Sequence, residues 1–431
     1  MPICLRKSRG FAALLRIVAW MDEFYHLPKS PMRRPSSHCE PRPHDGKREG
    51  MKHNIKKTNR HLPVLALVML AGLGTAFGQG TIISSPSGMD GSGIEAEHQK
   101  APRCSVVSGQ LLIDQGRYEQ AIREFTCLIE GDPTDVEGYR GRSEALLLLG
   151  RYSDALGDYA CITAFVLPVY PDAMGSILAD YAARLAIAPN DLPALTGLSF
   201  ARWVSFDYAQ SIHALNHLLE VQPNSVYGNL FRGSSRLLRG ATRVQGKADL
   251  EHALALAPHS ADVRFIVSDA YTYGEPDPER AFAEATLALA WGLDTPRIHA
   301  ILASAYHAFG DEQAAAIELQ RHFELVTTET LTTAPIAIDA SLSLDLVPGR
   351  TYEIPVAVNA GETISIATSS RDFYDSILVL LSPDGTPAVG SDDENGYFAA
   401  IDWVAEQTGT YRLLVTSFES INTGELIVTR D

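Results

Sequence analysis

The sequence lacks the short motifs that identify common hydrolases and redox enzymes. It contains no HExxH zinc motif, no GxSxG nucleophile motif and no paired CxxC motif. The segment Gly240–Lys247 partly matches a phosphate-binding loop, but it has one residue too many, and Ala248 stands where that loop needs a hydroxyl group. These absences favour a non-catalytic protein. An unrecognised hydrolase would have to carry its nucleophile, base or metal ligands in another arrangement.

The apolar segment Leu62–Leu73 is too short to cross a membrane, which takes roughly 20 residues. Basic residues precede it and small residues follow it, the pattern of a secretory signal peptide. We therefore assign residues 51–78 as a signal peptide cleaved after Ala76 or Gly78, with an uncleaved anchor as the alternative. Residues 79–101, rich in Gly and Ser, are expected to form a flexible leader. The pattern predicts export to the periplasm or the cell exterior, with no stable membrane span after cleavage.

Residues 1–50 precede this signal, although a signal peptide normally begins the translated chain. Our hypothesis is that translation starts at Met51 and that residues 1–50 are a misassigned upstream extension. A peptide from residues 1–50 in the mass spectrum of the precursor would refute it.

Basic residues are scarce beyond the signal peptide. Residues 79–431 hold 22 Lys and Arg against 47 Asp and Glu. Such an acidic excess repels polyanions. It argues against nucleic acid or an anionic membrane surface as a partner, and it is also typical of a soluble exported surface.

The sequence does contain the pattern of a helical hairpin, which occurs twice at a spacing of 34 residues. Gly116-Arg117-Tyr118 recurs as Gly150-Arg151-Tyr152, Ala121 as Ala155, and Phe125 as Tyr159. A glycine can end the first helix, a small residue lets the second helix approach closely, and an aromatic residue fills the space between them. One hairpin cannot bury its own apolar face, so this period predicts a stack of hairpins.

These two hairpins resemble the tetratricopeptide repeat family, with small and aromatic residues at the expected positions. We assign residues 102–326 to six or seven such units. The register breaks after Ile162, the segment Leu167–Pro171 is expected to form an irregular connection, and the helical pattern returns at Ile177. Helices are then predicted at about 193–205, 208–221, 227–239 and 246–256, followed by two hairpins at 261–291 and 297–325.

The resemblance implies a superhelix whose first helices line a concave groove that binds a protein or peptide. Placed on that geometry, eight residues are expected to point into the groove: Arg140, Glu144, Phe200, Trp203, Tyr227, Phe265, Tyr273 and His307. Aromatic and Arg side chains are favoured interface anchors. For each aromatic residue the alternative is packing between neighbouring helices.

Three cysteines remain after signal cleavage. Cys127 and Cys161 occupy equivalent places in successive hairpins, so their separation should exceed the reach of a disulfide. Cys104, near the start of one helix, and Cys127, near the end of its antiparallel partner, should lie close together. A disulfide between them is expected in an oxidising compartment, with buried thiols as the alternative.

The composition changes after Val326. Residues 327–334 are expected to form a polar linker, and beyond them the apolar period falls from 3.6 to 2. About eight short strands separated by turn signals predict an antiparallel β-sandwich over residues 335–431. Asp375-Ser376-Ile377-Leu378, Ser382-Pro383-Asp384-Gly385 and Gly409-Thr410-Tyr411 resemble the bacterial pre-peptidase C-terminal domain, a module of secreted peptidases. Here a repeat array stands in place of the peptidase, so protease activity does not carry over.

The acidic loop around residues 391–396 is a candidate calcium site. Oxygen ligands could come from Asp392, Asp393 and Asn395, with Asp375 and Asp402 as additions. The alternative is a solvated turn. No other cofactor is indicated.

Together these features predict a multidomain chain with an α-helical solenoid followed by a β-sandwich. We interpret it as an exported, non-catalytic scaffold that binds a protein or peptide, whose sandwich aids export, surface placement or attachment. The alternative is a carbohydrate- or matrix-binding accessory protein in which the sandwich binds a cell-surface or matrix polymer and the repeats act as a spacer.

Overall fold

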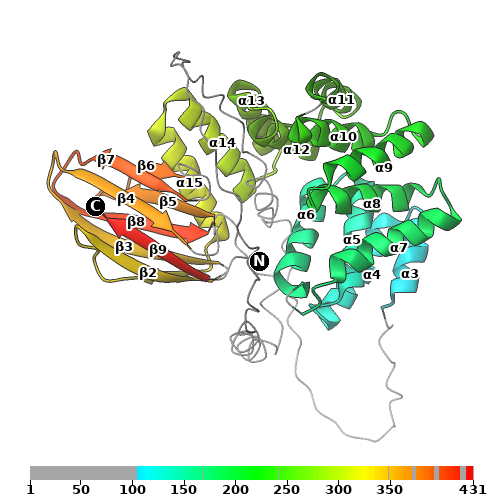
Figure 1. Ribbon diagram of the computed structural model, residues 1–431, viewed down its shortest axis with the longest axis horizontal. Coiled ribbons are helices and arrows are strands. Elements are labelled where there is room, and N and C mark those ends of the chain that lie inside the picture. Colours follow the sequence, from blue (N-terminus) through cyan, green and yellow to red (C-terminus); the bar gives the residue numbers. More distant parts are fainter. Residues whose placement is uncertain are drawn as a thin grey trace, which may run out of the picture. The chain divides into compact units, whose positions relative to one another are not determined.

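The computed structural model describes residues 104–167, 169–240, 242–347, 349–370, 375–392, 398–417 and 424–430. Helices occupy residues 106–326 and strands follow them as far as residue 430 (Figure 1). The predicted order of an α-helical solenoid followed by β-sheets is therefore confirmed. The segments assigned as an upstream extension (1–50), a signal peptide (51–78) and a leader (79–101) lie outside the described residues.

The helices follow one another with short connections. They are α3 (Val106–Asp114), α4 (Tyr118–Gly131), α5 (Val136–Leu149), α6 (Tyr152–Cys161), the π-helix η2 (Ile162–Val166), α7 (Ala173–Ile187), α8 (Leu192–Val204), α9 (Tyr208–Val221), α10 (Val226–Arg239), α11 (Arg243–Leu256), α12 (Ala261–Tyr273), α13 (Pro278–Ala290), α14 (Pro296–Phe309) and α15 (Glu312–Val326). Each helix predicted beyond residue 190 is present within a few residues of its expected bounds. In the described part of the chain no helix is both long and apolar enough to span a bilayer.

Local sequence sets many of the helix ends. Asp135, Asp191 and Ser225 each accept a hydrogen bond from a backbone N–H in the first turn of the helix that follows, which satisfies a donor that the helix itself cannot use. Gly150 and Gly310 end α5 and α14 in the left-handed conformation, which costs glycine no steric strain. The short turns between paired helices follow from these caps.

At two places in the array an aromatic ring of one helix packs closely against a glycine of the next helix. Phe125 of α4 is fully buried, and a Cβ atom added to Gly141 of α5 would lie only 2.2 Å from its ring. In the same way, a Cβ added to Gly197 of α8 would lie 2.2 Å from the ring of Tyr181 on α7. Helix α7 therefore packs on α8 as α4 packs on α5.

The regular alternation of helices breaks between α6 and α7. After α6 the chain forms the π-helix η2 and a short connection before α7 begins at Ala173, four residues earlier than the predicted return at Ile177. The break changes which helices meet, because α5 contacts α8 and α6 contacts α12.

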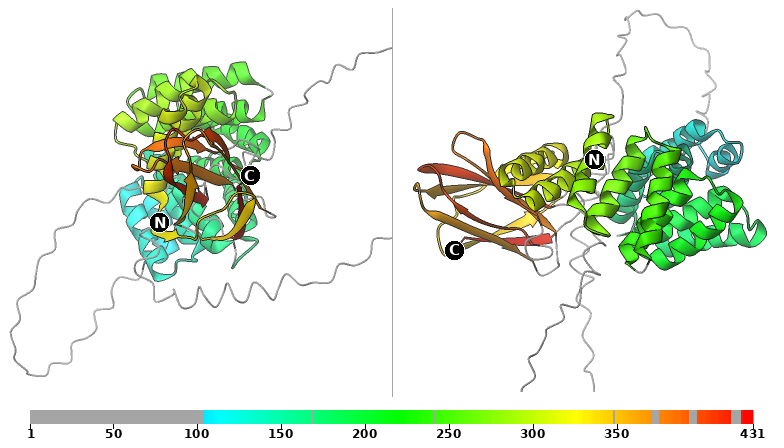
Figure 2. Two further views of the ribbon diagram at one scale, coloured as in Figure 1. Left: turned by 90° about the vertical axis from the view of Figure 1, so that its left-hand side faces the viewer. Right: turned by 90° about the horizontal axis from the view of Figure 1, so that it is seen from above.

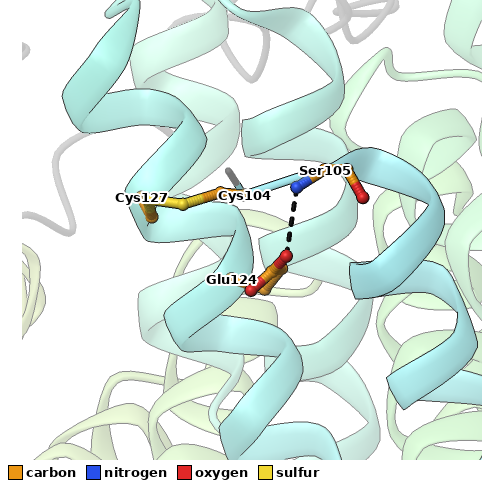
Figure 3. Close-up of a disulfide and its surroundings, with 4 residues drawn as sticks. All are labelled: Cys104, Ser105, Glu124 and Cys127. Carbon is orange, nitrogen blue, oxygen red and sulfur yellow. Dashed lines mark hydrogen bonds between the residues drawn. A yellow bond between two sulfur atoms is a disulfide. The ribbon is translucent and has the colours of Figure 1, made fainter. Parts of the chain in front are cut away.

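A disulfide joins Cys104 and Cys127, the pair expected from the sequence, with their Cα atoms 6.0 Å apart. Figure 3 shows the backbone N–H of Ser105 donating to Glu124 of α4, at 3.0 Å. Both contacts hold the start of α3 against α4. Cys161 is buried and is not part of this disulfide.

The strands form two stacked sheets. They are β1 (Glu329–Thr332), β2 (Ala340–Leu346), β3 (Arg350–Val358), β4 (Thr363–Ser369), β5 (Ser376–Leu381), β6 (Pro387–Ser391), β7 (Ala400–Val404), β8 (Gly409–Ser417) and β9 (Gly424–Arg430). One sheet has the order β1-β3-β8-β5-β6 and the other β2-β9-β4-β7. Apolar side chains from both sheets, including Ile354, Leu378, Tyr411 and Val428, form one core between them, as expected for a sandwich.

The predicted linker at residues 327–334 is wrong. Residues Glu329–Thr332 form β1, which pairs in parallel with β3, so that Leu331 lies opposite Tyr352. All four β1 side chains are exposed. The segment therefore has the exposed, polar composition of a linker, although its backbone pairs with β3 in the sheet.

Strand β5 is buried on both of its faces. Leu378 and Leu380 belong to the core of the sandwich. The alternate residues Ile377, Val379 and Leu381 pack against a cluster on the last hairpin that includes Leu319 and Phe323 of α15. Figure 2 shows the strands beside this yellow hairpin. The sandwich thus covers the apolar face that the last unit of a repeat array otherwise exposes.

We predict that Gly390→Val weakens this contact. A Cβ on Gly390 of β6 would lie 2.9 Å from Leu319 Cδ1 and 3.3 Å from the Cα atom of Ala316, so a larger side chain must push β6 away from α15. The expected loss is about 1–3 kcal/mol of unfolding free energy, measured by urea denaturation of residues 79–431. Ala357→Val, at an exposed position of β3 in the same sheet, is the control. Equal stability of the two variants would contradict the close contact.

Candidate functional site

The predicted groove residues lie on first helices of the units, on what we call the inner face of α5, α8, α10, α12 and α14. Phe200 and Trp203 are fully buried. Arg140, Glu144, Tyr227 and Phe265 are also buried, so these six residues do not line an open groove and their assignment as partner contacts is corrected. Tyr273 is partly buried, and the side chain of His307 is 59% exposed.

Helix α6 is the element that covers the aromatic part of the inner face. Tyr159 of α6 meets Phe200 of α8 edge to face, with ring centres 5.2 Å apart. Tyr152, at the start of α6, meets Phe231 of α10 in the same way at 5.4 Å. Trp203 stacks on Phe200 and donates from Nε1 to Ser234. The structure therefore brings three of the predicted aromatic residues together, Phe200, Trp203 and Tyr227, but their partner is the chain's own helix.

The first turn of α6 is capped by a distant residue. Its N-cap residue, Arg151, makes no side-chain cap bond. Instead, Asp262 of α12 accepts a hydrogen bond from the backbone N–H of Ser153 at 2.7 Å. A carboxylate at this end also interacts favourably with the helix dipole. Burial raises the pKa of Asp262, and the Ser153 hydrogen bond opposes that rise only in part. Figure 1 shows α6 between α5 and α12.

On its other side α6 is tied to α5. The guanidinium Nε of Arg142 lies 3.1 Å from both carboxylate oxygens of Asp158, a charge-assisted pair. Asp154 is the one residue of α6 that is not buried. A helix buried all round is an interior element, because each of its faces needs a protein partner.

Helix α7 contacts α3 and α5 through the side chains of Arg184 and Tyr181. Arg184 of α7 donates to both carboxylate oxygens of Glu144 at 3.0 and 3.1 Å. Gln110 of α3, which stands 34 residues before Glu144, donates to it at 3.4 Å. Arg140 lies 5.4 Å above the ring of Tyr181 and pairs with Glu137. Arg140 and Glu144 therefore belong to an internal network.

The physical reason for the correction is the break after α6. In a regular repeat array each second helix packs on neighbouring hairpins and the first helices line a groove. With the break, α6 covers aromatic surface of α8 and α10 and reaches α12 through Asp262. Helix α7 reaches α3 and α5 through Arg184 and Tyr181.

One part of the inner face stays open, next to the sandwich. A pocket of about 320 Å³ lies there, near the lower end of the range for ligand pockets. We call it the junction pocket. It is lined by Tyr273, Ala303, Ser304, His307, Ala315, Leu319, Gly390, Ser391 and Asp392. Tyr273 and His307 are thus brought together at one opening, as a groove would require.

A buried ion pair lies beside the junction pocket. Arg297 of α14 is 3% exposed at its side chain and donates to Asp269 of α12 at 2.8 and 2.9 Å. Its guanidinium lies 4.1 Å from the ring centre of Tyr273, a cation–π contact. Burial raises the pKa of Asp269, and Arg297 offsets this only in part. The negative charge of Asp392, at the end of β6, also raises the pKa of Arg297. The sandwich therefore helps to stabilise the buried positive charge of Arg297.

The calcium hypothesis stays a prediction. Asp375 and Asp392 stand at the same end of the paired strands β5 and β6, whereas Asp402 is exposed on β7 of the other sheet. Asp393 and Asn395 lie outside the described residues. Within the described ranges no three His, Cys, Asp or Glu side chains are grouped closely enough to hold a metal ion. A melting temperature unchanged by calcium and by chelator would remove this hypothesis.

Sequence reasoning missed the residues that close the inner face and those beside the pocket, such as Tyr152, Asp262 and Arg297. Two signals were available. The register break at residues 162–172 indicated a change of path, and the unbroken apolar run of β5, SILVLL, indicated a strand covered on both faces.

Residues 107–160, which run from α3 into α6, match the tetratricopeptide repeat family. No match is found among curated proteins. Tetratricopeptide repeats typically act as non-catalytic scaffolds for protein partners.

Some solved structures are similar to the helical part of the chain and others to its strands. A thermophilic tetratricopeptide repeat protein from Thermus thermophilus is 21% identical, covering 47% of this chain and 97% of that chain with a TM-score of 0.31. One from Parabacteroides merdae is 16% identical, covering 52% and 78% with a TM-score of 0.33. The pre-peptidase C-terminal domain of a Bacillus anthracis collagenase is 17% identical, covering 24% and 95% with a TM-score of 0.21. All three TM-scores are below 0.5.

We predict that Tyr152→Ala is far more destabilising than Tyr118→Ala. Both tyrosines follow the same Gly-Arg pair 34 residues apart, but Tyr152 is buried against Tyr227 and Phe231, whereas Tyr118 is only partly buried. Tyr152→Ala, which removes the buried ring, should lower the free energy of unfolding by roughly 3 kcal/mol. Tyr118→Ala should lower it by less than half of that amount. Chemical denaturation followed by circular dichroism measures both. Equal losses would mean that α6 is not held against α10.

Proposed function

We propose, on the premise that residues 107–160 are tetratricopeptide repeats, that this protein is an exported, non-catalytic scaffold that binds a protein or peptide partner at the junction pocket. The observation that carries the proposal is the closure of the rest of the inner face. Because α6 covers the aromatic surface that would face a groove in an open array, the junction pocket, which exposes Ser304 and His307, is where we place the partner on the described helices.

The composition of the pocket supports a binding role. Aromatic and small apolar side chains, among them Tyr273, Ala303 and Leu319, stand beside a few polar groups, the usual make-up of a recognition site. The last hairpin supplies one wall and β6 supplies another, and the docked sandwich holds both. A pocket with rigid walls loses little entropy when a partner binds.

The buried charges of the inner face are used internally, which supports a non-catalytic role. Arg297 is paired with Asp269 and Arg184 with Glu144. Such pairs hold helices together, and the raised pKa values of Arg297, Asp269 and Arg184 follow from burial and pairing.

Two features support export to the periplasm or the cell exterior. Residues 51–78 have the pattern of a signal peptide. The disulfide between Cys104 and Cys127 suits an oxidising compartment. Alkaline phosphatase fused after residue 78 should become active outside the cytoplasm, and an inactive fusion would refute the export signal.

We predict that Ser304→Trp abolishes partner capture. Ser304 is an exposed residue of α14 that lines the pocket, so an indole there should fill the opening without disturbing the core. Residues 79–431 would be used as bait in an extract of the source organism, with crosslinking and mass spectrometry. The control is Gln313→Trp, at an exposed position of α15 outside the pocket. Capture of the same protein by both variants would contradict the proposed site, and capture of a polysaccharide alone would contradict a protein partner.

A further inference from the structure

A buried histidine joins the two helices of the last hairpin. His299 lies in the first turn of α14, and its side chain is only 6% exposed. Its ring nitrogen Nδ1 lies 2.6 Å from a carboxylate oxygen of Glu318 on α15. The other ring nitrogen, Nε2, lies 2.9 Å from a carboxylate oxygen of Asp294, in the connection that precedes α14. The imidazole therefore has an acidic partner at each nitrogen.

Both contacts require a protonated ring. An ionised carboxylate only accepts hydrogen bonds, whereas a neutral imidazole has one nitrogen that donates and one that accepts. A neutral His299 would therefore turn a lone pair toward Glu318 or Asp294 in either tautomer. The imidazolium donates to both carboxylates and pairs with their charges. Burial alone would lower the pKa of His299, but the hydrogen bonds and charges of Glu318 and Asp294 raise it above its ordinary value.

Other charged groups lie near this contact, and each has a partner of its own. Arg321 of α15 donates to the second carboxylate oxygen of Asp294 at 3.0 Å and to Glu324 at 2.7 Å. Burial opposes the effect, but the hydrogen bonds from His299 and Arg321 hold the pKa of Asp294 below its ordinary value, so this carboxylate stays ionised. The charged groups of the neighbouring helices are bound to one another or to the backbone: Arg297 to Asp269, Glu284 to Arg264 and Arg280, and His322 to the carbonyl oxygen of Pro296.

Helix α15 also carries the sandwich. Leu319 and Phe323 of α15 belong to one apolar cluster with Val379 of β5. Glu318, which binds His299, directly precedes Leu319, so the same turn of α15 contacts α14 on one side and the strands on another. The contact that holds this turn against α14 therefore also positions the surface on which the sandwich is docked.

We propose that His299 is a pH-sensitive switch in the last hairpin: its protonated ring holds α15 against α14, and loss of the proton loosens α15 together with the docked strands. This switch does not depend on what the junction pocket binds. A group whose pKa is raised on folding stabilises the folded state fully below its unfolded value, which is about 6.5 for histidine. That stabilisation is lost as the pH rises through the folded pKa. The hairpin should therefore loosen in alkaline solution.

The test follows the ring of His299 and nearby methyl groups of residues 79–431 by NMR as the pH is raised. Both ring nitrogens should carry protons at neutral pH, as reported by their ¹⁵N shifts, and the ring should lose its proton above pH of about 6.5. The methyl signals of Leu319 and Val379 should shift with the same midpoint. His299→Gln should abolish that step and should lower the melting temperature by a few degrees more in mildly acidic than in alkaline solution. His252→Gln, at an exposed position of α11, should change neither.

Three results would overturn the proposal. The first is a neutral His299 ring at neutral pH, with the proton on Glu318 instead. The second is a ring midpoint at or below about pH 6.5, and the third is a ring that titrates while the Leu319 and Val379 signals stay fixed. If His299→Gln does not fold, Glu318→Gln provides the same test, because it keeps a hydrogen-bond acceptor but removes the charge. The midpoint of the His299 ring should then fall, and an unchanged midpoint would contradict the switch.

Discussion

The packing of α6 against the inner face of α8, α10 and α12 is the contact on which the rest of the helical array depends. Tyr152 and Tyr159 place two rings on the aromatic cluster of the first helices, and Asp262 caps the start of α6 from the far side. Burial of these rings supplies a large apolar contribution. The cap and the pair of Arg142 with Asp158 fix the position of the helix. The surface that could have been a peptide groove is thereby used for stability.

The sandwich has a comparable role at the other end of the array. A repeat array must cover the apolar face of its last unit, and β5 does so with Ile377, Val379 and Leu381. Strand β1 follows α15 directly and joins the sheet. The two domains are thus connected by a packed interface as well as by the chain. The pocket lined by α14, α15 and β6 exists because of this docking, so the proposed binding site depends on the packed interface.

Local patterns predicted most of the fold. The 34-residue period and the turn residues located the helices, and the change of period after Val326 located the sandwich, because helices and strands have distinct apolar spacings. The groove residues could not be predicted in this way. Phe200 is buried by rings that include Tyr159 of α6 and Phe231 of α10, which lie 41 residues before it and 31 residues after it in the sequence. Strand β1 was missed because its exposed side chains carry no apolar alternation. Contacts between segments distant in sequence decided both outcomes.

Amide hydrogen exchange of residues 79–431 tests the central claim most directly. If α6 is an interior helix that fills the inner face, its backbone amides should exchange as slowly as those of α8 and α10, because they open only when the array unfolds. The partly exposed helix α3 provides a faster internal reference. Slow exchange across Tyr152–Cys161 is the predicted result. Exchange in α6 as fast as in α3, with α8 and α10 still protected, would show that the inner face is open and would contradict the account.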